Sequence, residues 1–157
     1  METELISKTT KSPAEIRGGI LDFEKKLSKV PGVKVGDACC PLKHHFGSGL
    51  YVRELLALKG HLIVTKIHKL THPCFVMSGE VSVFTTEGVK RVKAPYWTMT
   101  PAGTQRICYV LSDSLWITVH PNPDDTEDLK VIEENVIAKG YDEVQLTEKE
   151  LKKLKEA

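Results

Sequence analysis

Two histidines, His68 and His72, stand four residues apart in the segment KIHKLTHP, directly before a strand-like run. Successive side chains of a β-strand project to opposite faces, so Lys66 and His68, two residues apart, share one face. A turn of the chain after His68 would bring His72 to the same space. His120 ends the run LWITVHP on the face that also carries Trp116. Three imidazoles around an open position suit Zn²⁺, Fe²⁺, Mn²⁺ or Ni²⁺, and the sequence therefore predicts a candidate metal site at His68, His72 and His120.

Cationic residues are expected in the same place. Lys66 and Arg106 would repel a divalent metal ion by about a few kcal/mol at an intermediate dielectric, an effect that Glu54 would partly offset. The planar guanidinium of arginine suits a carboxylate or a phosphate. With Tyr109 and Trp116 as aromatic lining, Lys66 and Arg106 predict a site for a small anionic ligand, such as an organic acid or a sugar nucleotide. The structural alternative is that the histidines are half-exposed, Arg106 is a surface cation and the aromatics belong to the core.

Short strands must hold these residues in position. Between Tyr51 and Val119 the chain consists of short runs rich in β-branched and aromatic residues. Turn signals about every 8 to 12 residues separate the runs, among them Lys59-Gly60, Glu87-Gly88 and Pro101-Ala102-Gly103. This pattern predicts an all-β barrel or sandwich over residues 50–121.

Helices are expected on both sides of the barrel. Ser12 and Glu15 form a capping box that begins a helix over residues 13–29. A second helix is expected over residues 128–138, and a further capping box at Thr147 and Glu150 precedes a charged end.

The predicted organisation is one domain with two extensions. Residues 1–49 form an N-terminal helical extension and loop, residues 50–121 the barrel, and residues 122–157 a C-terminal helical extension. His44 and His45 lie in the first of these segments and are expected in a solvated loop, because adjacent residues of an extended chain point in opposite directions.

Composition limits the function classes. The chain has 157 residues, with 22 Lys and Arg against 21 Asp and Glu, so its formal charge of +1 gives no global field that would gather nucleic acid. No apolar run is long enough to span a membrane, and the first residues lack the pattern of a signal peptide, so a cytoplasmic protein is expected. The four cysteines include no CxxC pair, which favours reduced thiols over a zinc finger.

Two longer segments resemble a known family. The segment GHLIVTKIHKLTHPCFVMSGEVSVF and the segment APYWTMTPAGTQRICYV resemble the two sequence motifs of the cupin superfamily, small barrels of the double-stranded jelly-roll type. The resemblance covers roughly residues 50–121 and implies a single cupin-like jelly-roll barrel, mainly β, with flanking helices. The stretches GLYVRE, KIHK and WITVHPN are also similar to cupin-like proteins of tailed bacteriophages and bacteria, which implies a place in the host cytoplasm or the virion.

The metal ligands of the family are only partly kept. The resemblance places the four usual ligand positions at Lys66, His68, His72 and Arg106, so only His68 retains its family residue. This departure favours a non-enzymatic cupin-like module that binds a small anionic ligand or serves in assembly. The alternative is a metal-dependent cupin enzyme that uses His68, His72 and His120. A homodimer is expected, because exposed strand edges need to be covered.

Overall fold

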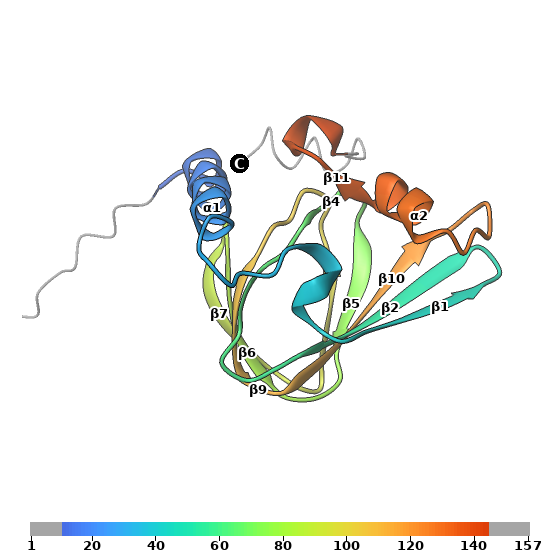
Figure 1. Ribbon diagram of the computed structural model, residues 1–157, viewed down its shortest axis with the longest axis horizontal. Helices are drawn as coiled ribbons and strands as arrows, with labels where there is room; N and C mark the ends of the chain where they lie inside the picture. The colour runs from blue at the N-terminus through green and yellow to red at the C-terminus, as the bar shows by residue number, and fades with distance from the viewer. Residues whose placement is uncertain (1–10, 145–157) are drawn as a thin grey trace, which may run out of the picture.

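The computed structural model describes residues 11–144 of the chain, and Figure 1 shows them as a β-barrel with helices at one end. The prediction of a mainly β fold with flanking helices is confirmed. The capping box predicted at Thr147 and Glu150 lies outside the described residues. Within residues 11–144, no helix is both long and apolar enough to cross a membrane.

Two antiparallel sheets form the barrel. The first has five strands, in the order β1 (Leu42–Gly47), β2 (Leu50–Ala57), β10 (Ser114–Pro121), β5 (His72–Val76) and β8 (Tyr96–Thr100). The second has four strands, in the order β3 (Leu62–Val64), β9 (Ile107–Ser112), β6 (Glu80–Thr85) and β7 (Gly88–Lys93). A two-stranded ribbon of β4 (Ile67–His68) and β11 (Ile137–Ala138) lies at the end of the barrel near the helices (Figure 1).

The helices begin where the sequence predicts. Helix α1 (Pro13–Leu27) starts at the capping box, in which the Ser12 backbone N–H donates to Glu15 Oε2 at 2.7 Å. Helix α2 (Leu129–Val136) is capped by Asp128, whose carboxylate accepts from the Lys130 backbone N–H at 2.9 Å. Two short 3₁₀ helices complete the described chain, η1 (Gly36–Cys39) and η2 (Tyr141–Glu143).

The core lies between the two sheets and under α2. Its main cluster consists of buried residues from both sheets, namely Ala57, Val76, Val81, Val83, Val92, Cys108 and Val110. A second cluster forms where Ile132 and Val136 of α2 pack on Tyr51 of β2. Because α2 buries its apolar side against the inner face of β2, it covers the same end of the barrel that the candidate histidines occupy.

Gly79 allows the tight connection between β5 and β6. Its φ of +79° is a conformation that side chains with a Cβ rarely adopt. A Cβ built there would lie 2.2 Å from the Asp113 carbonyl oxygen, so the backbone of the β9–β10 turn occupies the space. Gly79, which lies in the first of the two segments that resemble the cupin motifs, is thus required both by conformation and by close packing.

The structure corrects two expectations about local structure. His44 and His45 do not lie in a loop, because they belong to β1, which pairs with β2 through the hairpin at Ser48 and Gly49. Both turn residues have positive φ, 47° and 78°, as two-residue hairpins of this kind require. The five-stranded sheet therefore begins at Leu42, within the segment predicted as a helical extension and loop. In addition, the run that was expected to reach His68 as one strand is divided into β3 and β4.

Candidate metal centre

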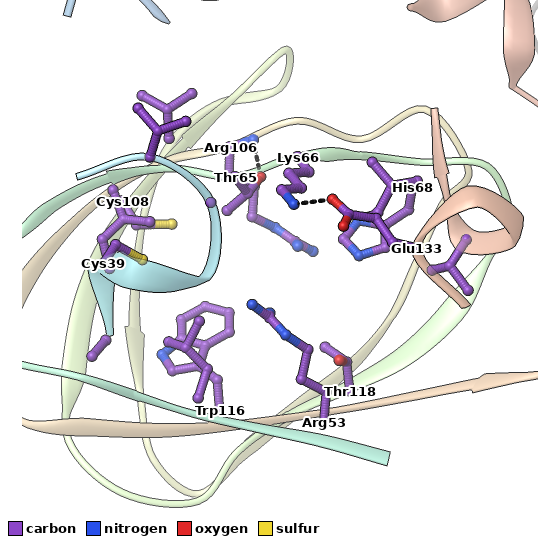
Figure 2. A pocket seen from close by; sticks show the side chains of 18 of the residues that line it. Cys39, Arg53, Thr65, Lys66, His68, Arg106, Cys108, Trp116, Thr118 and Glu133 are labelled. Carbon is purple, nitrogen blue, oxygen red and sulfur yellow. Dashed lines mark hydrogen bonds and ion pairs between the residues drawn. The ribbon is translucent and has the colours of Figure 1, made fainter. Parts of the chain in front are cut away.

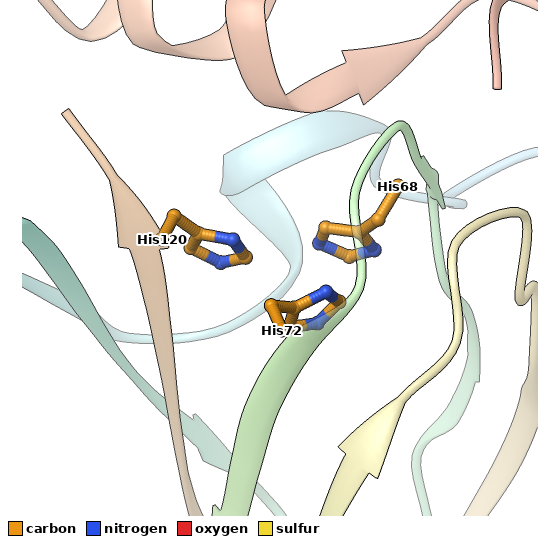
Figure 3. Close-up of side chains that lie close together, drawn as sticks. All are labelled: His68, His72 and His120. Carbon is orange, nitrogen blue, oxygen red and sulfur yellow. The ribbon is translucent and has the colours of Figure 1, made fainter. Parts of the chain in front are cut away.

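Three strands bring the predicted histidines together. His68 comes from β4, His72 is the first residue of β5, and His120 lies near the end of β10. Strands β5 and β10 are neighbours in the five-stranded sheet, so His72 and His120 approach each other across the pair. Figure 3 shows the three rings facing a common space, where one nitrogen from each lies within 4.8 Å of the others. The ring centroid of His72 is 4.3 Å from that of His68 and 4.6 Å from that of His120.

Hydrogen bonds orient two of the rings. His72 Nδ1 lies 3.0 Å from the Leu70 carbonyl oxygen, which can only accept, so Nδ1 carries the proton and Nε2 the lone pair. His72 Nε2 is buried and has no hydrogen-bond partner among the described residues. His120 Nε2 lies 2.9 Å from Thr118 Oγ1, a hydroxyl that can donate or accept, and this bond orients the ring. Such bonds to the second ring nitrogen commonly fix the tautomer of metal-binding histidines.

Burial keeps the three imidazoles neutral. The pKa of His68 is held well below its usual value by burial and then by the nearby His72 and His120. Burial lowers the pKa of His72, and burial together with the neighbouring His72 lowers that of His120 to about 3. Only a neutral imidazole has a lone pair to donate, so all three side chains could serve as metal ligands at neutral pH. The donor set, the orphaned Nε2 and the charge state all fit a divalent metal.

A cavity of about 320 Å³ opens beside the histidines. Figure 2 shows the guanidinium groups of Arg53 and Arg106 entering it from opposite walls. Arg106 is held in place because its Nη2 donates to Thr100 Oγ1 at 2.7 Å and its backbone N–H to Thr65 Oγ1 at 2.9 Å. The cavity therefore has two cationic groups next to the candidate metal centre.

Lys66 also lines the cavity, but its charge is compensated. Its ammonium group forms an ion pair with Glu133 of α2, and both side chains are partly exposed (Figure 2). The expectation that Glu54 would offset the cations is wrong. Glu54 lies on the other face of the sheet, where its Oε2 is 3.4 Å from His45 Nε2, and it does not line the cavity.

Of the two aromatic residues expected to line the cavity, Trp116 and Tyr109, only Trp116 does so. Tyr109 does not line it, because Tyr109 alternates on β9 with the buried Cys108 and Val110 and is 48% exposed. The side chain of Tyr109, predicted as a ligand-binding residue, therefore does not face this cavity.

Sequence reasoning missed Arg53 and Glu133. Arg53 shares the inner face of β2 with Tyr51 and Leu55, and the strand period would have placed it there only once that face was known to be the inner one. Glu133 carries no local signal, because its place depends on how α2 packs against the barrel. The thiol of Cys39 also lines the cavity, 3.2 Å from the sulfur of Cys40.

Comparisons with known proteins concern the fold. No protein-family model matches the sequence, and no curated protein matches it significantly. Solved structures do match. The crystal structure of ectoine synthase from P. lautus has a TM-score of 0.52 at 10% identity, over 78% of this chain and 91% of that chain.

Two other solved structures match with lower TM-scores. KdgF from Halomonas sp. has a TM-score of 0.47 at 15% identity, over 57% of this chain and 85% of that chain. A cupin-2 domain containing protein from Shewanella frigidimarina has a TM-score of 0.44 at 9% identity, over 68% of this chain and 98% of that chain. At such identities the likeness concerns the fold, and the fold of this chain is the cupin, or double-stranded β-helix, barrel.

Proposed function

We propose that the protein binds one divalent metal ion through His68, His72 and His120 and holds a small organic anion beside it. The observation that carries the proposal is the buried His72 Nε2, which has no partner among the described residues and faces two further neutral imidazoles. A buried polar atom without a partner is costly, and a metal ion would compensate that cost. When bound, the metal supplies a Lewis acid next to the cavity.

The ligand count supports a catalytic type of site. Structural metal sites are usually closed by four protein ligands, whereas catalytic sites have three and keep a position open. In the described part of the chain, the cluster contains three histidines and no fourth His, Cys, Asp or Glu. This count favours the metal-dependent enzyme over a role in assembly.

The charge of the cavity supports an anionic ligand. Glu133 compensates Lys66, but Arg106 forms no ion pair among the described residues, and Arg53 lies on the opposite wall. A divalent ion would add two positive charges to this space. An anion bound between the metal and the arginines would balance them, which accounts for cations at positions that would otherwise repel the metal.

Metal content tests the proposal. Protein purified without an affinity tag should contain about one equivalent of a divalent metal, or should take up one on addition of Zn²⁺, Mn²⁺, Fe²⁺ or Ni²⁺, as measured by elemental analysis. His72→Ala should lose it. His61→Ala is the matched control, because His61 is exposed and outside the cluster. Equal metal content in His72→Ala and in the unaltered protein, or no uptake at all, would contradict the proposal.

A second candidate function is a metal-free anion-binding protein. It is favoured by the two cations, Lys66 and Arg106, that stand at positions where the resemblance implies metal ligands. The two functions differ in one measurable respect. If the protein takes up no divalent metal and still binds small carboxylates, the metal-free binding function is the correct one.

A further inference from the structure

The inner end of the cavity is apolar. Its wall is formed by side chains from both sheets, namely Leu55, Ala57, Val81, Cys108, Val110 and Trp116. Several of these belong to the main hydrophobic core, and Val81 and Val110 are 0% and 1% exposed. The cavity therefore runs from a polar mouth into the core of the barrel and ends there.

The apolar and charged walls lie at successive depths. On the inward face of β2, the charged Arg53 is followed by the apolar Leu55 and then by Ala57. Arg53 also pairs with His44 of the neighbouring β1, which lines the cavity too. Strand β10 repeats the order in the opposite direction, from His120 through Thr118 to Trp116. Both strands thus change from polar to apolar along the same direction of the barrel, as their antiparallel register requires.

Two hydrogen-bond donors in the cavity could be satisfied by oxygen atoms of a ligand. Arg106 is oriented by Thr100 and Thr65, and its charge has no carboxylate partner among residues 11–144. The indole Nε1 of Trp116 is buried and also lacks a described hydrogen-bond partner. Arginine binds carboxylates through paired N–H groups, so a carboxylate is the head group that these donors fit best.

We infer that the ligand is a small monocarboxylate with an aliphatic tail of about seven carbons. Its carboxylate lies between Arg53 and Arg106, beside the three histidines, and its tail extends past Trp116 onto Leu55 and Val110. The cavity volume of about 320 Å³ is at the lower limit of small-molecule sites. Since a water molecule occupies about 30 Å³ of liquid, the space suits a ligand of roughly ten non-hydrogen atoms. A sugar nucleotide, one of the ligands considered from the sequence, is too large.

This inference rests on the proposed function only for the place of the head group next to the metal. The arginines and the apolar end of the cavity do not depend on the ion. Octanoate should therefore bind to chelator-treated protein as well as to metal-loaded protein, and the two proposals can fail separately. Metal uptake without selective octanoate binding overturns the inference alone, and selective octanoate binding without metal uptake overturns the proposed metal site alone.

Isothermal titration calorimetry with the unaltered chain provides the main test. Octanoate should bind at least tenfold more tightly than butyrate, because each buried CH₂ group contributes roughly fourfold. Octanoate should also bind at least tenfold more tightly than octanol, which has the tail without the charge. Equal affinity for octanoate and butyrate would overturn the tail assignment, and equal affinity for octanoate and octanol would overturn the head-group assignment.

Two variants locate the binding. Arg106→Gln should weaken octanoate binding at least tenfold, whereas Arg91→Gln should leave it unchanged, because Arg91 is an exposed arginine paired with Glu80 away from the cavity. Leu55→Ala should weaken octanoate binding and leave butyrate binding unchanged. Thermal unfolding of each variant checks that it is folded. Unchanged octanoate affinity in folded Arg106→Gln, or binding to the unaltered protein only when metal is present, overturns the inference.

Discussion

Near the mouth of the barrel, the two faces of the five-stranded sheet depart from the usual pattern. Antiparallel sheets commonly turn an apolar face to the core and a polar face to water. Here the inner face of β5 and β10 carries His72, Thr118 and His120 near the mouth. The outer face carries a row of three apolar residues on neighbouring strands, Ile117, Phe75 and Trp97. Phe75 is the register partner of both Ile117 and Trp97.

The two faces therefore need different partners. The Phe75 and Trp97 rings stack at 6.4 Å between centroids, and Trp97 is 64% exposed, so apolar area remains open on the outside. Inside, three imidazoles are held neutral in a buried space. A polar interior requires a bound ion or ligand to compensate it, and an apolar exterior requires another surface to cover it.

The largest expected effect is a loss of metal affinity when His120 of β10 is replaced, with no such loss at the adjacent residue. His120→Ala removes one of three metal ligands and should lower metal affinity by more than 100-fold, measured by competition with a chromogenic chelator. Val119→Ala changes the neighbouring position, on the outer face, and should leave affinity within about twofold. No loss in His120→Ala would mean that the metal binds elsewhere, and similar losses in both variants would mean that both distort the strand.

Acid should destabilise the metal-free protein through the inner face. His120 has a pKa of about 3 when folded and about 6.5 when unfolded, so below pH 6.5 the unfolded state binds more protons. The stability present above pH 6.5 is then lost progressively down to about pH 3. Between pH 7 and pH 5 this single group should cost about 2 kcal/mol in the free energy of unfolding.

Urea unfolding of chelator-treated protein at several pH values measures this loss. His120→Asn should show a weaker dependence on pH. His45→Asn, a change at an exposed position of the outer face, should follow the unaltered protein. A stability that does not change between pH 7 and pH 5 would contradict the neutral, buried state of the cluster.

We propose that the homodimer expected from the sequence forms through the outer face. Light scattering should then give about twice the chain mass of 17.5 kDa. Trp97→Lys should weaken the dimer about 30-fold, as the loss of a central aromatic side chain costs about 2 kcal/mol in many interfaces. Val89→Lys changes an equally exposed apolar residue of the other sheet and should leave the mass unchanged. A monomer mass for the unaltered protein would reject the proposal.

The smallest effect tests the hydrogen bond behind one ligand. Thr118→Val keeps the shape of the side chain and removes the oxygen that lies 2.9 Å from His120 Nε2. Metal affinity should fall about tenfold, because bonds of this type orient the ligand. Ile117→Val, at the adjacent position, is the control. An unchanged affinity in Thr118→Val would show that packing alone fixes the His120 ring.

Alternation along the strands was enough to predict the histidine cluster but not its surroundings. His68, His72 and His120 could be placed together because the strand period and the turn before Pro73 determine where their side chains lie. Arg53 was missed because both faces of β2 contain apolar residues, so the pattern YVRELLAL did not show which face lies inside. An inner face that contains charge cannot be recognised from hydrophobicity.

Contacts between elements that are far apart in the sequence could not be predicted from it. Glu133 reaches Lys66 only because α2 packs over the mouth of the barrel. Tyr109 was chosen for its residue type, although its alternation with Cys108 and Val110 indicates the outer face. The sequence predicts a loop rather than β1 at His44 and His45, although Ser48-Gly49 stands between two strand-like runs, as in a β-hairpin.

The pairing of β4 with β11 sets an order of events during synthesis of the chain. His68 pairs with Ile137, and the Lys69 backbone N–H donates to the Val136 carbonyl oxygen at 2.8 Å. The strands that carry His72 and His120 can pair as soon as residue 121 has left the ribosome. His68 gains its sheet partner only when residue 138 has followed. Before that, the His68 carbonyl oxygen can already accept from the Gly103 backbone N–H at 2.9 Å, so we expect His68 to be held more loosely at first and the cluster to become fully ordered only when β11 pairs.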